Sequence, residues 1–210
     1  MKQGFIFDMD GVLVHTDRFH YLAWKHLADA KGIPFDETVN RRLRGLSREA
    51  SLDIILEGYP GAAYSAAEKA ALCAEKNEIC RGYLSAMTPA DAAPEVRETL
   101  AALRKRGCRL AVGSSSKNAR LVLDRTGLTE AFDAISDGTN ITRAKPDPEV
   151  FLKAAELLGL APADCAVVED AEAGIDAAKA GGFFAVGLGD AAEYAKTDYP
   201  LRDFSELLKL

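Results

Sequence analysis

The stretch Phe5-Ile6-Phe7-Asp8-Met9-Asp10-Gly11-Val12 decides the fold, because an apolar run ends there in two carboxylates and a glycine. The apolar run predicts a strand that is buried on both faces, as in a parallel sheet. Asp8 would then stand at the carboxyl end of that strand, with Asp10 just beyond it. Ligands bind at this edge of open α/β sheets, so both carboxylates are candidate functional residues. An ordinary strand followed by an Asp-Gly turn is the alternative that this stretch leaves open.

The composition limits the classes of protein to which the chain can belong. It has 210 residues, of which 48% are hydrophobic, and a formal net charge of −6. This suits one globular domain, or one domain with an insertion, with enough chain for a core. The mild acidity argues against nucleic acid as the main partner, whereas small anions remain possible because a local field can oppose the net charge. Without a signal peptide or a membrane-spanning run, we expect a cytoplasmic protein with no membrane partner.

The four cysteines are expected to be reduced thiols. Cys73 and Cys80 lie two helical turns apart, which is too far for a disulfide. Cys108 and Cys165 open predicted buried strands, where cysteine behaves as a small hydrophobic residue. No Cys-x-x-Cys pair or Cys/His cluster indicates zinc. Reduced thiols agree with a cytosolic location.

The segment after the first strand predicts helices and no convincing strand up to Met87. A first helix is expected from Asp17 to about Lys31, with Thr16 as its N-cap and Gly32 as its end. Further helices are expected over residues 37–44, 48–57 and 65–86, the last beginning with a capping box.

From Pro94 onward, helices alternate with short apolar strands. Strands are expected over residues 108–113, 132–135, 165–168 and 183–187, with a weaker one near the end. Ser116 is expected to cap the helix that follows the first of these. The alternation predicts a parallel sheet with helices on both faces. The first strand belongs to this sheet, because a lone strand could not satisfy its backbone hydrogen bonds.

The expected architecture is therefore an α/β parallel sheet with an α-helical domain inserted after the first strand. The sheet domain comprises residues 1–15 and 88–210, and the helical domain comprises residues 16–87. The two junctions would serve as hinges, because a small domain on two linkers beside a strand-end crevice is a typical lid.

Polar residues follow the ends of four predicted strands, and these ends share one edge of a parallel sheet. They are Asp8 and Asp10, Ser114, Lys145, and the pair Glu169-Asp170. Each has a structural explanation by itself, such as a helix cap for the serine or a solvated surface position for the lysine. Their convergence on one edge is what indicates a site.

The residue types indicate phosphoryl transfer. Asp8 can act as a nucleophile that carries a phosphoryl group, and Asp10 can move the proton of the attacking or leaving hydroxyl. Four carboxylates would repel one another without a cation, and oxygen-only ligands suit Mg²⁺. Lys145 would neutralise phosphoryl oxygens, and Ser114 would donate a hydrogen bond to one of them. Positioning and charge stabilisation are what this reaction mainly needs.

The motifs in this order resemble the haloacid dehalogenase-like phosphotransferase superfamily. The matching motifs are Asp8-Met9-Asp10-Gly11-Val12, Ser114, Lys145-Pro146, and Glu169-Asp170-Ala171 with Gly174. The resemblance implies a Rossmann-like core with a helical cap inserted after strand one.

The resemblance also implies roles for the core residues. Asp8 would be the aspartyl-phosphate nucleophile and Asp10 the general acid/base. Mg²⁺ would be bound by Asp8, the backbone carbonyl of Asp10 and Asp170. Glu169 would be a further ligand or would contact a ligand without touching the metal. Ser114 and Lys145 would complete the catalytic set.

Two motifs of the inserted domain are His20-Tyr21-Leu22-Ala23-Trp24-Lys25 and Leu43-Arg44-Gly45-Leu46-Ser47-Arg48-Glu49. They resemble those of the β-phosphoglucomutase family. The resemblance assigns the distal phosphate to Arg48, Ser116 and Asn118. It implies a full substrate-binding set of Thr16, His20, Trp24, Arg44, Gly45, Arg48, Ser51, Lys76, Ser115, Ser116, Lys117 and Asn118. Two residues depart from the family pattern, His15 near the first junction and Glu95 after Pro94.

The expected function is a Mg²⁺-dependent mutase that interconverts β-D-glucose 1-phosphate and glucose 6-phosphate through an aspartyl-phosphate and β-glucose 1,6-bisphosphate. Its expected partners are small-molecule sugar phosphates, and it is expected to be a monomer because no long exposed apolar stripe demands a partner. A Mg²⁺-dependent sugar-phosphate phosphatase is the first alternative. A non-enzymatic receiver-like domain, phosphorylated on Asp as a signal, is the second.

Overall fold

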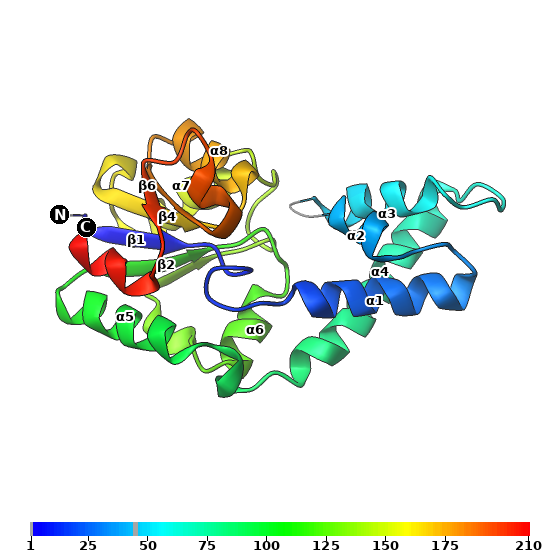
Figure 1. Cartoon of the computed structure of the whole chain (residues 1–210), viewed down its shortest axis with the longest axis horizontal. Coiled ribbons are helices and arrows are strands. Elements are labelled where there is room, and N and C mark those ends of the chain that lie inside the picture. The colour runs from blue at the N-terminus through cyan, green and yellow to red at the C-terminus, as the bar shows by residue number, and fades with distance from the viewer. Residues whose placement is uncertain (1, 44–45) are drawn as a thin grey trace. The chain divides into compact units, whose positions relative to one another are not determined.

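The structure is a computed structural model that describes residues 2–43 and 46–210. The chain divides into two compact units (Figure 1). The core unit comprises Met1–His15 with Met87–Leu210, and the helical unit comprises Thr16–Ala86. The second junction falls one residue before the expected position.

The core unit is built on one six-stranded sheet in the order β3-β2-β1-β4-β5-β6, and all neighbouring strands are parallel. The strands are β1 (Gly4–Phe7), β2 (Arg109–Gly113), β3 (Ala134–Ser136), β4 (Cys165–Glu169), β5 (Phe184–Leu188) and β6 (Tyr199–Leu201). The predicted α/β parallel sheet is confirmed. Strand β1 lies between β2 and β4, which explains its uninterrupted apolar sequence.

Helices cover both faces of this sheet (Figure 1). The helices α7 (Glu149–Leu158) and α8 (Glu172–Ala180) lie on one face, and α5 (Pro94–Lys105), α6 (Ala119–Arg125) and the C-terminal 3₁₀ helix η5 (Phe204–Lys209) lie on the other. Other short 3₁₀ helices are η1 (Pro89–Asp91), η2 (Thr129–Ala131), η3 (Pro162–Asp164) and η4 (Gly189–Glu193).

Successive residues of β1 are buried in different side-chain clusters. Ile6 belongs to the same apolar cluster as Phe151 of α7. The ring of Phe7 packs instead against Phe132 and Phe204, with ring centroids 6.0 and 5.9 Å apart. Burial on both faces fixes the direction and register of the strand, because a slip by one residue would exchange these two environments.

The helical unit contains α1 (Asp17–Lys31), α2 (Glu37–Arg41), α3 (Arg48–Leu56) and α4 (Ala66–Ser85). Its own apolar core includes Trp24, Leu52 and Leu72, one from each of α1, α3 and α4. Helix α4 begins with the expected capping box between Ser65 and Glu68, in which both reciprocal hydrogen bonds are present.

Several local expectations differ from the structure, and three of them concern residues near the junctions and strand ends. Thr16 occupies the N-cap position of α1, but its side chain forms no capping hydrogen bond there. Ser116 does not cap α6, because its hydroxyl accepts a hydrogen bond from the N–H of Asn118 and forms a turn that delays the helix to Ala119. Strand β2 begins one residue after Cys108.

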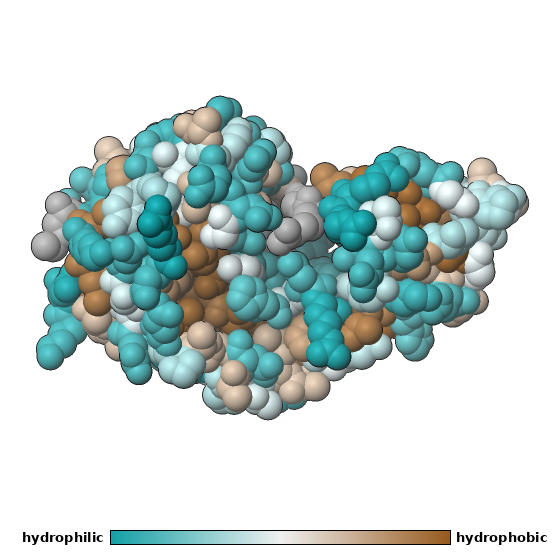
Figure 2. Space-filling view, viewed as in Figure 1, coloured by the Kyte–Doolittle hydropathy of each residue, from teal (hydrophilic) through white to brown (hydrophobic). Residues whose placement is uncertain are grey.

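The surface of the described residues carries only scattered large apolar side chains. Leu46, Leu152 and Leu157 are the exposed ones, and Figure 2 shows polar residues over much of the visible face. All four cysteines are free thiols. No described helix combines the length and the hydropathy that spanning a bilayer requires.

Candidate active site

The carboxyl ends of β1 and β4 bring two acidic residues to one lysine. The two strands pair with Phe7 opposite Val168, so Asp8 and Glu169 follow at the same level of the sheet. The Nζ atom of Lys145 lies 2.5 Å from Oδ1 of Asp8 and 2.5 Å from Oε1 of Glu169. The predicted convergence of these distant segments is therefore present in the fold.

A third carboxylate and two glycines complete this cluster. Asp8, Glu169 and Asp170 each offer a carboxylate oxygen, and these oxygens lie within 4.8 Å of one another. A Cβ atom on Gly11 would stand 2.0 Å from Oδ2 of Asp170, and one on Gly174 would stand 1.9 Å from Oε1 of Glu169. Both positions therefore require glycine so that the carboxylates have room.

Burial and charge act against each other within the cluster. Burial raises the pKa of Asp8 well above its ordinary value, Lys145 opposes this rise, and the Glu169 and Asp10 carboxylates add to it. Burial by itself would lower the pKa of Lys145, but Asp8 and Glu169 outweigh it and hold that pKa above its ordinary value. The lysine is therefore charged, and it shares its single positive charge among several carboxylates.

This donor set fits a metal ion. Its three carboxylates offer oxygen ligands, which hard divalent cations prefer, and Lys145 neutralises only one of their negative charges. A bound cation would relieve the remaining repulsion. The ligand role expected for the backbone carbonyl of Asp10 stays a prediction.

The loop that presents Lys145 is held closed by Glu149, in the first turn of α7. Its carboxylate accepts hydrogen bonds from the N–H groups of Thr142 and Arg143, at 2.9 and 2.8 Å. Arg143 also forms an ion pair with Asp147, at 3.0 Å. This role of Glu149 could not be predicted from the sequence, because the first turn of a helix favours an acidic residue in any case.

The serine loop, defined as Ser114–Asn118, follows β2. The hydroxyl of Ser114 accepts a hydrogen bond from the N–H of Ser116, and the hydroxyl of Ser116 accepts one from the N–H of Asn118, both at 3.2 Å. Ser114 and Asn118 are buried, with 2% and 4% of their surface exposed. These two N–H groups are thus used within the loop, so we expect side chains to contribute much of any anion binding there. The substrate contacts expected from Ser115 and Lys117 stay predictions.

Several expected substrate-binding residues gather inside the helical unit. Nζ of Lys76 lies 3.2 Å from Nδ1 of His20 and 5.1 Å from the ring centroid of Trp24. Burial, with Lys76 and then Arg48 as positive neighbours, lowers the pKa of His20 to about 3. His20 is therefore neutral near pH 7, and because an ammonium only donates, its ring proton lies on Nε2.

Arg48 opens α3, where a positive charge is unfavourable next to the helix N-terminus. It donates a hydrogen bond of 2.8 Å to Oδ1 of Asn77, a residue that the expected set does not include. Thr16 and Ser51 are both buried. Arg44 and Gly45 lie outside the described residues. The substrate-binding roles of all these residues stay predictions.

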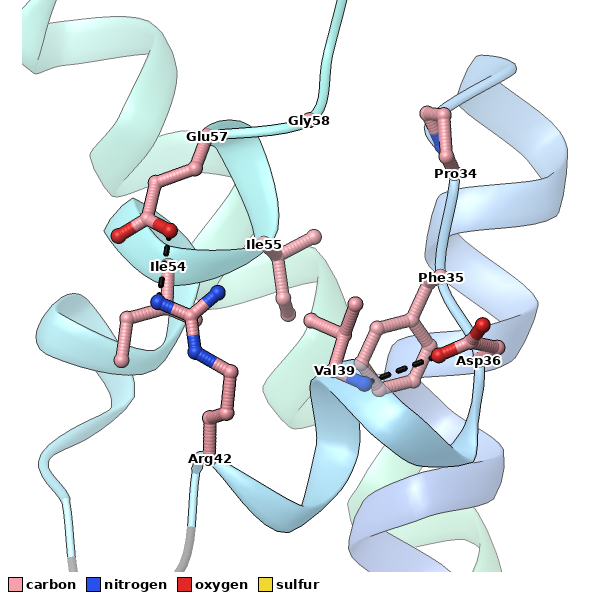
Figure 3. A pocket seen from close by; sticks show the side chains of 9 residues that line it. All are labelled: Pro34, Phe35, Asp36, Val39, Arg42, Ile54, Ile55, Glu57 and Gly58. Carbon is pink, nitrogen blue, oxygen red and sulfur yellow. Dashed lines mark hydrogen bonds and ion pairs between the residues drawn. The ribbon is translucent and has the colours of Figure 1, made fainter.

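The helical unit also has a surface pocket of about 340 Å³ (Figure 3). Apolar residues such as Phe35 and Ile55 line it, and an Arg42–Glu57 ion pair of 2.7 Å lies at its edge. None of the expected site residues that the structure describes lines this pocket, so it is separate from the clusters above.

Comparisons with known proteins agree with these observations. The family model for haloacid dehalogenase-like hydrolases matches residues 2–182. The β-phosphoglucomutase of Bacillus subtilis is 43% identical over 203 residues, which cover 96% of this chain and 90% of that protein. A phosphorylated carbohydrates phosphatase of Thermotoga maritima is 30% identical over 182 residues, covering 86% and 82%.

A solved structure gives the same result. The crystal structure of β-phosphoglucomutase from Clostridium difficile matches with a TM-score of 0.89 and 36% identity, covering 99% of this chain and 93% of that one. The chain therefore belongs to the haloacid dehalogenase-like hydrolase family, within its β-phosphoglucomutase group.

Proposed function

We propose that this protein interconverts β-D-glucose 1-phosphate and glucose 6-phosphate, through an aspartyl-phosphate on Asp8 and a β-glucose 1,6-bisphosphate intermediate. The observation that carries the proposal is the placement of Lys145 between Asp8 and Glu169. The identity of 43% to a β-phosphoglucomutase supports the choice of reaction.

The first half of the reaction transfers one phosphoryl group from the bisphosphate to the enzyme and releases a sugar monophosphate. A carboxylate oxygen of Asp8 attacks phosphorus, and the bond between phosphorus and the sugar oxygen breaks. Asp10 gives a proton to the departing sugar oxygen. Lys145 balances the negative charge that spreads over the phosphoryl oxygens, and Ser114 donates a hydrogen bond to one of them.

The second half reverses these roles on a different hydroxyl. Asp10 takes the proton of the free hydroxyl of a sugar monophosphate, whose oxygen attacks the phosphoryl group on Asp8 and forms the bisphosphate again. The bisphosphate then turns over and returns its other phosphoryl group to Asp8. This cycle needs a second anion site, which we assign to Arg48, Ser116 and Asn118.

We propose Mg²⁺ as the cation of the acidic cluster, with Asp8, the carbonyl of Asp10 and Asp170 as ligands and Glu169 beside them. When bound, Mg²⁺ would supply positive charge that lets an anionic phosphate approach Asp8. The oxygen-only donor set supports this choice of metal.

A sugar-phosphate phosphatase is the second candidate, since the family also contains the Thermotoga relative at 30% identity. It would use the same core residues, with water attacking the phosphoenzyme. We also propose that the protein is a cytoplasmic monomer, in keeping with four free cysteines and scattered exposed apolar residues.

A ³¹P NMR time course tests the proposal. The protein is mixed with Mg²⁺, β-glucose 1-phosphate and a trace of β-glucose 1,6-bisphosphate. Growth of the glucose 6-phosphate signal is expected. Rapid release of inorganic phosphate would favour the phosphatase instead, and no turnover of either kind would contradict both. A parallel sample with α-glucose 1-phosphate reports the choice of anomer.

A further inference from the structure

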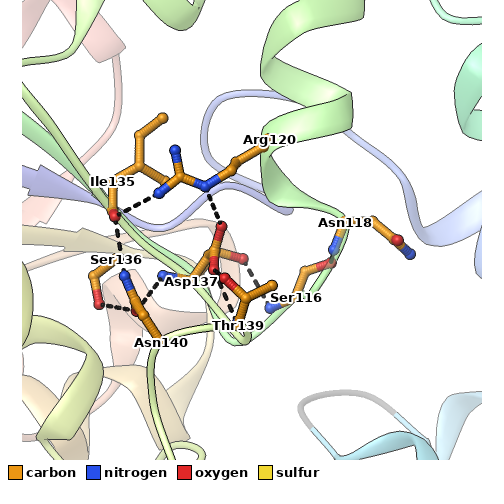
Figure 4. A network of polar contacts seen from close by, with 9 residues as sticks. Ser116, Asn118, Arg120, Ile135, Ser136, Asp137, Thr139 and Asn140 are labelled. Carbon is orange, nitrogen blue, oxygen red and sulfur yellow. Dashed lines mark hydrogen bonds and ion pairs between the residues drawn. The ribbon is translucent and has the colours of Figure 1, made fainter.

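The serine loop rests on a second loop, Ser136–Asn140, which we call the supporting loop (Figure 4). It begins at the last residue of β3. The carbonyl of Ser136 accepts a hydrogen bond from the N–H of Ser114, at 3.1 Å, and the N–H of Gly138 donates to the carbonyl of Ser116, at 3.2 Å. The two loops are therefore joined through their backbones.

We propose that Gly138 and Asp137 are positioning residues that hold the serine loop in the shape that binds the distal phosphate of the substrate. The inference rests on the proposed function, which gives Ser116 and Asn118 that phosphate. Neither Gly138 nor Asp137 belongs to the set that sequence analysis assigned to the site.

Gly138 supports the proposal because it lies very close to the backbone of the serine loop. A Cβ atom at this position would stand 2.5 Å from the carbonyl oxygen of Ser115 and 2.9 Å from the N atom of Lys117. Both are backbone atoms, so a side chain here must displace the serine loop itself. The φ angle of Gly138 lies outside the left-handed region, so alanine can adopt its backbone conformation.

Asp137 ties the supporting loop to the helix that follows the serine loop. Its side chain is fully buried, and its Oδ1 accepts a 2.9 Å hydrogen bond from the N–H of Thr139. Its Oδ2 lies 3.1 Å from Nε of Arg120, in the first turn of α6, as an ion pair without hydrogen-bond geometry. The charge of this buried carboxylate attracts the half-exposed arginine and so favours the observed position of the start of α6, next to the Asn118 end of the serine loop.

The supporting loop is itself locked by Asn140. The Oδ1 atom of Asn140 accepts a 3.0 Å hydrogen bond from the N–H of Asp137, and its Nδ2 donates to the carbonyl of Ile135, at 3.3 Å. A loop fixed in this way gives the serine loop a rigid base. Rigidity matters for affinity, because a preformed anion site loses little entropy when it binds.

We expect a substitution at Gly138 to change KM more than kcat. Gly138 faces Ser115 and Lys117, whereas Asp8, Lys145 and Glu169 are held together by their own contacts. The N–H of Ser114 is held separately by the carbonyl of Ser136. Displacing the Ser115–Asn118 part of the serine loop should therefore weaken substrate binding more than phosphoryl transfer. Loss of about one charge-assisted hydrogen bond to phosphate predicts a rise in KM of roughly tenfold.

The test compares Gly138→Ala with Gly82→Ala. Gly82 lies in α4, and a Cβ atom there would have no neighbour within 4 Å. We expect Gly138→Ala to raise the KM for β-glucose 1-phosphate about tenfold with kcat reduced less than threefold, and Gly82→Ala to change neither. An unchanged KM in folded Gly138→Ala, or a fall in kcat alone, would overturn the proposal.

Two further measurements keep the test decisive. Inorganic phosphate should raise the melting temperature of the wild type more than that of Gly138→Ala, and this readout needs no turnover, so it remains valid if the proposed reaction fails. Equal shifts would contradict the positioning role.

A second variant is available if Gly138→Ala does not fold. Thr139 is exposed, and Thr139→Val removes the hydroxyl that donates to Asp137, so it should raise KM about threefold. An unchanged KM in that variant would also reject the proposal.

Discussion

The ammonium of Lys145 lies 2.5 Å from a carboxylate oxygen of Asp8, although 137 positions separate the two residues in the sequence. Asp8 follows β1, whereas Lys145 lies in the loop between β3 and α7, and β2 separates β1 from β3 in the sheet. The contact therefore depends on the assembled sheet as well as on the two loops. It places the positive charge next to the atom that would attack phosphorus.

Replacing Lys145 with alanine should lower kcat by roughly 10²–10³, because the charge of the transferring phosphoryl group would lose its protein counterion. Steady-state kinetics with saturating Mg²⁺ measure this. Lys153→Ala is the matched control, since Lys153 lies on α7 and pairs with Glu156 at the surface. A Lys145→Ala enzyme with the kcat of the wild type would show that this lysine has no catalytic role.

Glu149→Gln should loosen the loop that presents Lys145. Hydrogen bonds to the carboxylate, chiefly from the N–H of Thr142, lower the pKa of Glu149 to about 2 from 4.5. Because the folded-state pKa is depressed, the stabilisation is complete above pH 4.5 and disappears as the pH falls through about 2. We therefore expect a lower urea midpoint for the variant at pH 7, a smaller difference near pH 3.5, and a reduced kcat.

Glu156→Gln provides the comparison for Glu149→Gln. Glu156 lies on the same helix and pairs with Lys153 at the surface, so its loss should change neither the midpoint nor kcat appreciably. If the two variants behave alike, Glu149 does not hold the Lys145 loop.

Much of the core site could be predicted from the sequence because its signals are local. An apolar run that ends in Asp8 and Asp10 predicts both the buried strand and the position of its carboxylates. The same reasoning applies to Glu169 at the end of β4. Parallel strands then bring these ends to one edge, so topology converts separate local patterns into one cluster.

The residues that hold the loops of the site in place could not be predicted in the same way. Glu149 holds Thr142 and Arg143, and Gly138 approaches Ser115, but no periodicity relates these residues to their partners. Such contacts arise only when loops pack, which residue spacing does not encode. The failed helix cap at Ser116 has a related cause, since a serine can also form a turn with the N–H two residues on.

His20 should remain neutral under mildly acidic conditions. Burial, followed by the charges of Lys76 and Arg48, lowers its pKa to about 3. Between pH 6.5 and about 3 the unfolded chain binds a proton that the folded protein does not, so the free energy of unfolding falls as the pH drops through this window. NMR of the ring protons should show no titration of His20 between pH 8 and pH 5.

The variant Lys76→Met separates the two causes of this low pKa. It removes a positive neighbour but leaves the half-buried ring among the same helices, so the pKa of His20 should rise and still stay below 6.5. A His20 that titrates near pH 6.5 in the wild type would contradict the neutral imidazole that the contact with Lys76 requires.

Gly11 and Gly182 allow a comparison in which backbone strain is matched and only the acidic cluster differs. Their φ angles are +81° and +77°, so alanine at either position costs about 1–2 kcal/mol in the left-handed region. A Cβ atom on Gly182 would meet nothing within 4 Å, whereas one on Gly11 would stand 2.0 Å from Oδ2 of Asp170. Only the Gly11 variant should therefore disturb a metal ligand.

We expect Gly11→Ala to lose at least as much stability in urea unfolding as Gly182→Ala, and Gly11→Ala alone to lose activity and Mg²⁺ affinity. The Mg²⁺ concentration for half-maximal rate should rise at least tenfold, because displacing one carboxylate removes a charged ligand from the site. Isothermal titration with Mg²⁺ measures the affinity directly and needs no substrate. If both variants bind Mg²⁺ as the wild type does, Asp170 is not a ligand, and the metal must be held elsewhere in the cluster.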